Sequence, residues 1–269
     1  MGNYIWPILF LFAITMGSCS NDNTPGPVIG NSGHIRFRFL QNVDGQPLQT
    51  DTMRYINSAG NHYQVDEVMY FISDVRLSCS DGTKKMISDW KDIHYVDSNI
   101  PSTRIWDVFD SIPAGDYDSI TFVFGITGEK NKSFMFVNYP EAKMMWPDVL
   151  GGGYHYMMLN GKWLDHNGIK QIYNFHLGIG QLYKSDVIVP DSIYAFVQNY
   201  FSVKLPNSSF TIERDSTTEV EIIMNIESWF KTPHDFDFNY WGGAIMEIQP
   251  AMQMAKENGY DVFTTGQIR

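Results

Sequence analysis

Apolar and polar residues alternate along much of this chain, and the alternation predicts strands. Residues 34–40 place Ile35, Phe37 and Phe39 on one face, with arginines between them. A period of two residues is typical of a strand that buries one face. The turn Val43-Asp44-Gly45 follows directly, as expected at the end of such a strand.

Similar segments recur at fairly regular spacing, separated by turn residues rich in glycine, aspartate and proline. Short strands in this arrangement predict an all-β protein, an antiparallel β-sandwich with Greek-key-like connections. The further predicted strands are Val68–Cys79, Asp92–Val96, Arg104–Phe109, Ser119–Ile126, Tyr154–Leu159, Gln171–Leu177, Ile193–Val203, Ser209–Glu213 and Glu219–Ile226.

A short helix is predicted only near the C-terminus, at Gln249–Glu257. Pro250 stands near its start and Gly259 just beyond its end, positions where these residues favour helix boundaries. No repeat of fixed period divides the chain. We therefore expect residues 33–269 to form a single β-sandwich domain.

The N-terminus carries a different signal. Ile5–Met16 is an almost unbroken apolar run, too short to span a bilayer comfortably, and Met16-Gly17-Ser18-Cys19 follows it. Small residues before a cysteine are what a bacterial lipoprotein signal peptidase requires. We predict a signal peptide at 1–18, lipidation of Cys19, and a flexible polar tether at 19–32.

Charge and cysteine content narrow the functional classes. The net charge is −11, and no basic cluster offsets it, which argues against nucleic acid as a partner. We expect the membrane link to be the acyl chains on Cys19 alone. Cys79 is then the only other cysteine, so no internal disulfide is expected.

Catalytic signatures are missing from the sequence. It contains no G-x-S-x-G, P-loop, H-E-x-x-H or dinucleotide-binding glycine pattern, and its carboxylates are scattered. We therefore expect a protein that is not an enzyme.

Candidate chemistry is concentrated in residues 146–158, where Trp146 and three consecutive glycines precede an aromatic strand. Alternation in that strand predicts that His155 and Met157 share a face. A second histidine, His176, lies in another predicted strand. An imidazole beside a soft thioether suits copper better than calcium or magnesium. His155 and His176 would share a metal site if their strands are neighbours.

An ordered series of segments resembles the copper-binding MbnP-like domain family, in particular its lipoprotein branch from Bacteroidetes. The resemblance spans roughly residues 34–264 and depends on order and spacing more than on any one motif. It rests on Ile35–Phe39, Tyr63–Leu77, Pro113–Tyr117, Met145-Trp146, Gly152–Tyr154, Phe175–Gly178, Met224–Ile226 and Trp229-Phe230.

The resemblance implies an all-β domain outside the cytoplasm that binds one copper ion. It further implies that Trp146 is oxidised to kynurenine and joins histidines as a ligand, with a dihaem peroxidase-like protein as partner. His176 matches the H-L-G segment of the family, whereas His155 rests on spacing alone. No histidine occurs at 139–145, where the family has a further one before its tryptophan.

A protein of this kind is expected in the cell envelope, anchored by lipid. Ser20 stands after Cys19 in place of the aspartate that indicates retention at an inner membrane, so we expect the outer membrane. The alternative function is a surface lipoprotein that binds glycan or a partner protein and has lost the metal site. That alternative depends on aromatic side chains, namely Tyr154, Tyr156, Trp163, Tyr240 and Trp241, lying in an exposed row.

Overall fold

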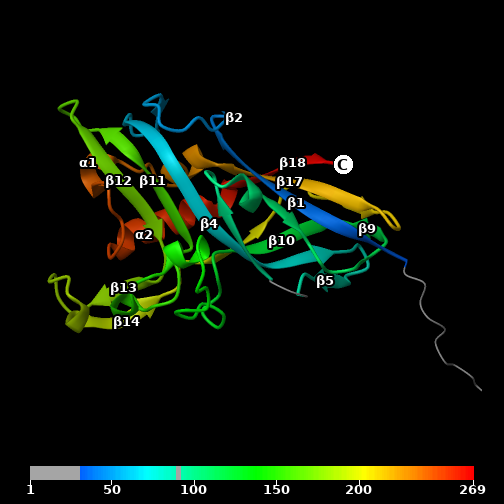
Figure 1. The fold of residues 1–269 in the computed structure, drawn as a ribbon. Coiled ribbons are helices and arrows are strands. Elements are labelled where there is room, and N and C mark those ends of the chain that lie inside the picture. The colour runs from blue at the N-terminus through cyan, green and yellow to red at the C-terminus, as the bar shows by residue number, and fades with distance from the viewer. Residues whose placement is uncertain (1–30, 89–91) are drawn as a thin grey trace, which may run out of the picture. The chain divides into compact units, whose positions relative to one another are not determined.

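The computed structural model describes residues 31–88 and 92–269, which belong to one compact unit, Asn31–Arg269 (Figure 1). The predicted signal peptide, Cys19 and all but the last two residues of the predicted tether lie outside the described residues. In the described part of the chain, no helix is long and apolar enough to cross a membrane.

The described strands form two large sheets and two small ones, which confirms the predicted all-β class. The first sheet contains β1 (Ser32–Val43), β2 (Gln46–Pro47), β7 (Ile105–Asp107), β8 (Ile112–Pro113), β17 (Thr217–Asn225) and β18 (Phe263–Ile268). The second contains β3 (Tyr55–Ile56), β4 (His62–Ser78), β5 (Lys84–Met86), β6 (Ile93–Asp97), β10 (Ser119–Phe124), β11 (Met157–Leu164), β12 (Lys170–Leu177) and β15 (Phe201–Lys204).

The small sheets each pair two strands, and the helices are short. The small sheets are β13 (Gly180–Tyr183) with β14 (Ile193–Val197), and β9 (Gly115–Tyr117) with β16 (Phe210–Ile212). The α-helices of the described residues are α1 (Phe238–Trp241) and α2 (Gln249–Asn258). Short 3-10 helices occupy Pro101–Arg104, Glu141–Met144, Asp148–Leu150, Pro190–Ser192, Ile226–Phe230 and Gly259–Asp261.

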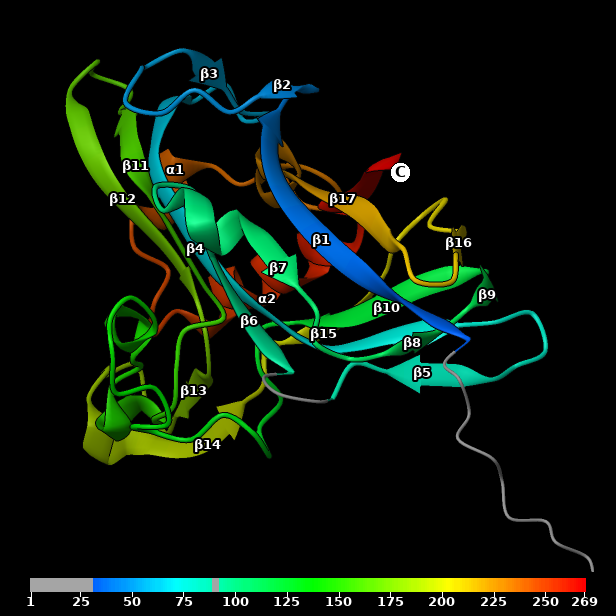
Figure 2. The same ribbon diagram turned by 45° about the vertical axis from the view of Figure 1, so that its right-hand side comes forward.

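The alternation predicted for the first strand is present in β1, where Ile35, Phe37 and Phe39 are all buried. Phe39 meets Tyr70 of β4 edge-on, with ring centroids 6.4 Å apart, so the inner faces of the two large sheets share one aromatic core. One pairing departs from the antiparallel expectation, because β1 runs parallel to β17 over nine paired positions (Figure 2).

The central strand β4 is buried on both faces over residues 68–75. Tyr70 and Ile72 face the shared core, whereas Met69 and Phe71 belong to a second, smaller apolar cluster on the other face. Tyr95 of β6 also belongs to that cluster. Its other members, Ile126, Met144 and Tyr154, all come from the long connection between β10 and β11. That connection therefore covers the outer face of β4 and β11, and it carries Trp146 and His155.

Helix α2 begins at the predicted residue and extends one residue further than predicted, to Asn258. It buries Ala251, Met252 and Ala255 in the shared core. Pro250 lies in the first turn, where its missing amide hydrogen leaves no intrahelical bond unmade.

Candidate metal centre

Trp146 is held rigidly under the connection between β10 and β11. Its side chain is fully buried, and its indole Nε1–H donates to the carbonyl of Leu150 at 3.1 Å. Gly151, Gly152 and Gly153 all have positive φ, between +69° and +115°. A run of such angles requires glycine, and it turns the chain back so that the Trp146 amide donates to the Gly153 carbonyl at 2.8 Å.

His155 follows this turn and is only 6% exposed. Its Nδ1 lies 2.9 Å from the carbonyl oxygen of Met144, which can only accept a hydrogen bond, so Nδ1 carries the proton. Nε2 is then a bare lone pair in the neutral ring. That nitrogen is buried and has no hydrogen-bond partner among the described residues.

His176 is fixed in the same manner from β12. Its Nε2 lies 2.7 Å from Oδ1 of Asn160 on β11, the adjacent strand. Because Oδ1 accepts, Nε2 donates, and the neutral ring leaves Nδ1 without a proton. Each histidine is therefore held in one tautomer by a hydrogen bond to one ring nitrogen, and the other nitrogen is unprotonated.

The structure brings together three of the four residues predicted for the site. The rings of His155 and His176 lie 5.1 Å apart at their centroids and are nearly perpendicular, at 89°. Trp146 packs edge-on against His155, with centroids 4.6 Å apart. The two histidines lie on neighbouring segments, as the shared site requires. His176 is on β12, which pairs with β11, and β11 begins two residues after His155.

Burial keeps both imidazoles neutral. Desolvation lowers the pKa of His155 to about 4, against a smaller upward effect of the bond to Met144. Burial, together with a smaller effect of the neighbouring His155, lowers the pKa of His176 to about 3. At neutral pH both rings therefore present lone pairs rather than positive charges.

Met157 does not join this pair, contrary to the shared face expected for His155 and Met157. It lies opposite Leu177 in the strand register and is buried in the shared core. Tyr156, its neighbour in sequence, is buried in the same core, so the alternation of faces breaks between them. The physical reason is a bend at Tyr156, just before the regular strand β11 begins at Met157.

The methionine on the face of His176 is Met158. It stands directly opposite His176 in the register and is partly buried against the second cluster, which also contains Met144. Residues directly opposed across two antiparallel strands have Cβ atoms about 5 Å apart. The H-x-M spacing predicts Met157 for the site, whereas the methionine opposite His176 is Met158, one position later.

Asn160 orients His176, and no motif in the sequence predicts this role. Its amide nitrogen reaches Glu67 at 3.5 Å, and Glu67 pairs with Lys143 at 2.9 Å. This polar chain links the histidine to the surface and fixes the amide orientation. Only the register of β11 against β12, not the sequence spacing, places Asn160 beside His176.

The site fits a soft metal with a small number of protein ligands. A buried, unpartnered imidazole nitrogen beside a second bare imidazole nitrogen is costly unless a cation or a proton donor satisfies it. Among the described residues, no group of three or more His, Cys, Asp or Glu side chains could hold a metal. Any further protein ligand must therefore be of another type. The indole of Trp146 packs against His155, and Met158 stands opposite His176.

Comparison with known proteins identifies the family of this chain. The MbnP family profile matches residues 32–247, most of the chain. The chain belongs to the MbnP family. Among solved structures, MbnP from Methylosinus trichosporium is similar, with a TM-score of 0.56 and 15% sequence identity. The match covers 87% of this chain and 98% of that chain. A search of curated proteins gave no match.

At 15% identity the structural likeness to MbnP from Methylosinus trichosporium supports the fold alone. The profile match, by contrast, contains Trp146, His155 and His176 within its limits. Family membership and the geometry of the histidine pair are thus independent observations, and both bear on function.

Proposed function

We propose that this MbnP family member is an extracytoplasmic lipoprotein that binds or handles one copper ion. His155 and His176 would hold the ion through Nε2 and Nδ1, respectively. The observation that carries the proposal is the buried Nε2 of His155, which has no hydrogen-bond partner among the described residues. It lies beside a second imidazole held in a fixed tautomer. Metal-binding histidines are commonly oriented in this way by a carbonyl or amide oxygen on the other nitrogen.

Copper is favoured by the type of donor. Neutral imidazole suits copper and zinc, and thioether sulfur favours Cu(I) in particular. Met158 lies opposite His176, and no carboxylate of the described residues forms a metal cluster with the pair. Copper bound here would serve storage, transfer or electron transfer, since the proposal assigns binding and no catalytic step.

Trp146 is proposed as a modified or supporting residue of the site. The family resemblance implies its oxidation to kynurenine with a dihaem peroxidase-like partner. Contact between its ring and His155 supports a place beside the metal. Mass spectrometry of the peptide that contains Trp146, from protein isolated from its native host, tests this part of the proposal by itself.

Lipid attachment at Cys19 and residence at the outer membrane belong to the same proposal. Lipid attachment rests on the apolar run and the Met16–Cys19 segment, and outer-membrane residence rests on Ser20 in place of an aspartate. Metabolic labelling with a fatty acid, compared between the full chain and Cys19→Ser, tests the anchor. Label that persists in the variant would refute it.

The alternative function, glycan binding by a row of exposed aromatic side chains, gains no support from their positions. Tyr154 and Tyr156 are fully buried, and Trp163 is 5% exposed. Of the five aromatic residues considered, Tyr240 alone is strongly exposed, at 77%. They form no exposed row on which a sugar could stack.

The decisive experiment is elemental analysis of the protein, purified without a metal-affinity tag and titrated with Cu(I) and Cu(II). We expect one copper per chain in the wild type and its loss in His155→Ala and His176→Ala. His62→Ala is the matched control, because His62 is exposed on β4 and remote in the register from the pair. A folded wild type that takes up no copper, or equal loss in the control, would refute the proposal.

A further inference from the structure

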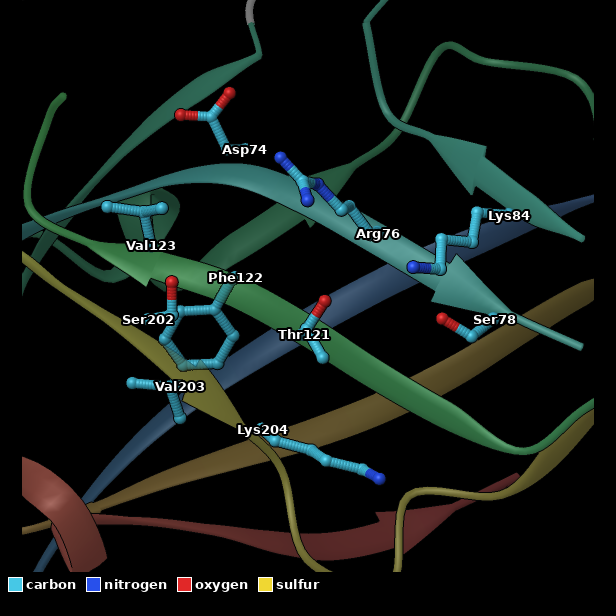
Figure 3. Close-up of a pocket in the computed structure, with 10 residues that line it drawn as sticks. All are labelled: Asp74, Arg76, Ser78, Lys84, Thr121, Phe122, Val123, Ser202, Val203 and Lys204. Carbon is cyan, nitrogen blue, oxygen red and sulfur yellow. The ribbon is translucent and has the colours of Figure 1, made fainter. Parts of the chain in front are cut away.

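A second feature of the fold lies on the outward face of the large sheet that contains β4, away from the shared core. The strands β4, β5, β10 and β15 form a hollow of about 360 Å³ there (Figure 3). A hollow of this volume is within the usual range for small-molecule sites. Its charged lining includes Arg76, Lys84 and Lys204, which come from three different strands.

The strand register brings these cations together. Arg76 on β4 stands opposite Thr121 on β10, and Thr121 stands opposite Lys204 on β15. Lys84 on β5 pairs with Ser78, two residues beyond Arg76 on the same face of β4. Because neighbouring strands lie about 4.8 Å apart, the Cα atoms of Arg76 and Lys204 are separated by about 10 Å.

None of the three cations has its charge neutralised within the part of the chain described. Their side chains are exposed, and no ion pair or side-chain hydrogen bond connects them to another described residue. Asp74 is the one carboxylate in the lining, and it already pairs with Lys130 at 2.6 Å. The chain as a whole carries a net charge of −11, whereas the lining of this hollow has more positive than negative side chains.

The rest of the lining limits the chemistry of the ligand. Ser78, Thr121 and Ser202 offer hydroxyl groups, which donate to and accept from the hydroxyls of a ligand. Phe122 and Val203 are buried, at 2% and 6% exposure, and so provide no apolar wedge for a bilayer and no exposed ring for stacking a base.

We propose that this hollow binds an acidic oligosaccharide through its carboxylate or sulfate groups. Arg76 and Lys204 would each bind one anionic group of the ligand, and the intervening Thr121 would bind a sugar hydroxyl. Lys84 extends the same cationic face toward β5. The site is separate from the histidine pair, so this inference does not depend on copper binding.

Isothermal titration of the full-length chain in detergent tests the proposal. The probes are an oligogalacturonate hexamer and a heparin-derived hexasaccharide, with a neutral gluco-oligosaccharide and detergent micelles containing anionic lipid as comparisons. We expect binding to at least one acidic hexamer, weakened by added salt. We expect no binding to the neutral sugar.

Charge-removal variants identify the site. Arg76→Gln with Lys204→Gln should weaken acidic-sugar binding by about tenfold or more, since charge-assisted hydrogen bonds are lost. The matched control is Lys170→Gln with Lys184→Gln, which changes net charge equally at exposed positions outside the lining of the hollow. Circular dichroism confirms that each variant folds, and copper uptake should be unchanged in all of them.

Three results would overturn the proposal. The first is the absence of binding to either acidic hexamer by the folded wild type. The second is equal weakening in the control pair, which would show a nonspecific charge effect. The third is binding to micelles that contain anionic lipid without binding to the oligosaccharides, which would make the face a membrane-contact surface.

Discussion

Gly178 leaves the space that the indole of Trp146 occupies. A Cβ atom at Gly178 would lie 2.6 Å from Cε3 and Cζ3 of Trp146, closer than any normal contact. The glycine that ends the segment Phe175–Gly178 is therefore needed because of a residue 32 positions earlier in the chain. Gly178 therefore also determines where the indole of Trp146 can lie against His155.

Gly178→Ala should consequently destabilise the domain and displace the indole. Overpacking of a buried site typically costs about 1–3 kcal/mol. Urea unfolding gives the loss of stability, and the fluorescence emission of the native state reports on the tryptophan environment. Gly128→Ala is the control, because a Cβ there meets Gln198 only at ordinary contact distance. Equal stability of the two variants would contradict the assignment.

Stability of the metal-free protein should fall as pH is lowered from 7 to 5. The unfolded chain protonates its histidines near pH 6.5, whereas the native state binds these protons only near pH 4 at His155 and pH 3 at His176. The unfolded state binds more protons in this window, so it gains stability relative to the native state, by about 2 kcal/mol per histidine at pH 5. Above pH 6.5 the native state keeps the full contribution.

Urea unfolding at pH 7 and pH 5 measures this dependence. His176→Gln should remove part of the difference between the two pH values, whereas His62→Gln, at an exposed position on β4, should leave it unchanged. A wild type whose stability is equal at pH 7 and pH 5 would show that the two imidazoles are not buried as neutral rings.

Asn160→Ala should weaken copper binding without removing a ligand. The variant loses the acceptor that fixes the tautomer of His176, and such losses commonly cost 10- to 100-fold, roughly, in metal affinity. Competition with a chromophoric Cu(I) chelator measures the change. Asn174→Ala, at the exposed position directly opposite Asn160, is the matched control and should bind copper like the wild type.

Met158→Leu should lower Cu(I) affinity more than Met157→Leu does. Only Met158 stands on the face of His176, whereas Met157 is buried in the shared core opposite Leu177. Both substitutions keep a similar apolar volume, so neither should cost much stability. The same chelator competition decides between them, and a greater loss in Met157→Leu would contradict the register.

The predicted fold class came from local patterns, and these are the features that the structure reproduces best. The alternation of Ile35, Phe37 and Phe39, and the limits of the helix at Gln249, depend on a few neighbouring residues. The parallel pairing of β1 with β17 could not be predicted, because no local pattern indicates which distant strand will lie alongside.

The candidate site could be predicted only in part for a related reason. His155, His176 and Trp146 were identifiable from residue type and family resemblance. Placing Met157 correctly required the strand alternation to hold across Tyr156, and the bend there breaks it. Asn160 and the basic hollow at Arg76 depend on strand register, which sequence spacing does not determine.

The parallel pair formed by β1 and β17 also has a consequence for how the domain is assembled during synthesis. His34 meets Thr217, and Asn42 meets Asn225, across a separation of 183 residues. Until residues 217–225 are made, one long edge of β1 stays open to pairing with other chains. Folding that must wait for such distant contacts is slow and prone to aggregation. An incomplete chain that lacks residues 217–225 therefore presents β1 as an open template for pairing between chains.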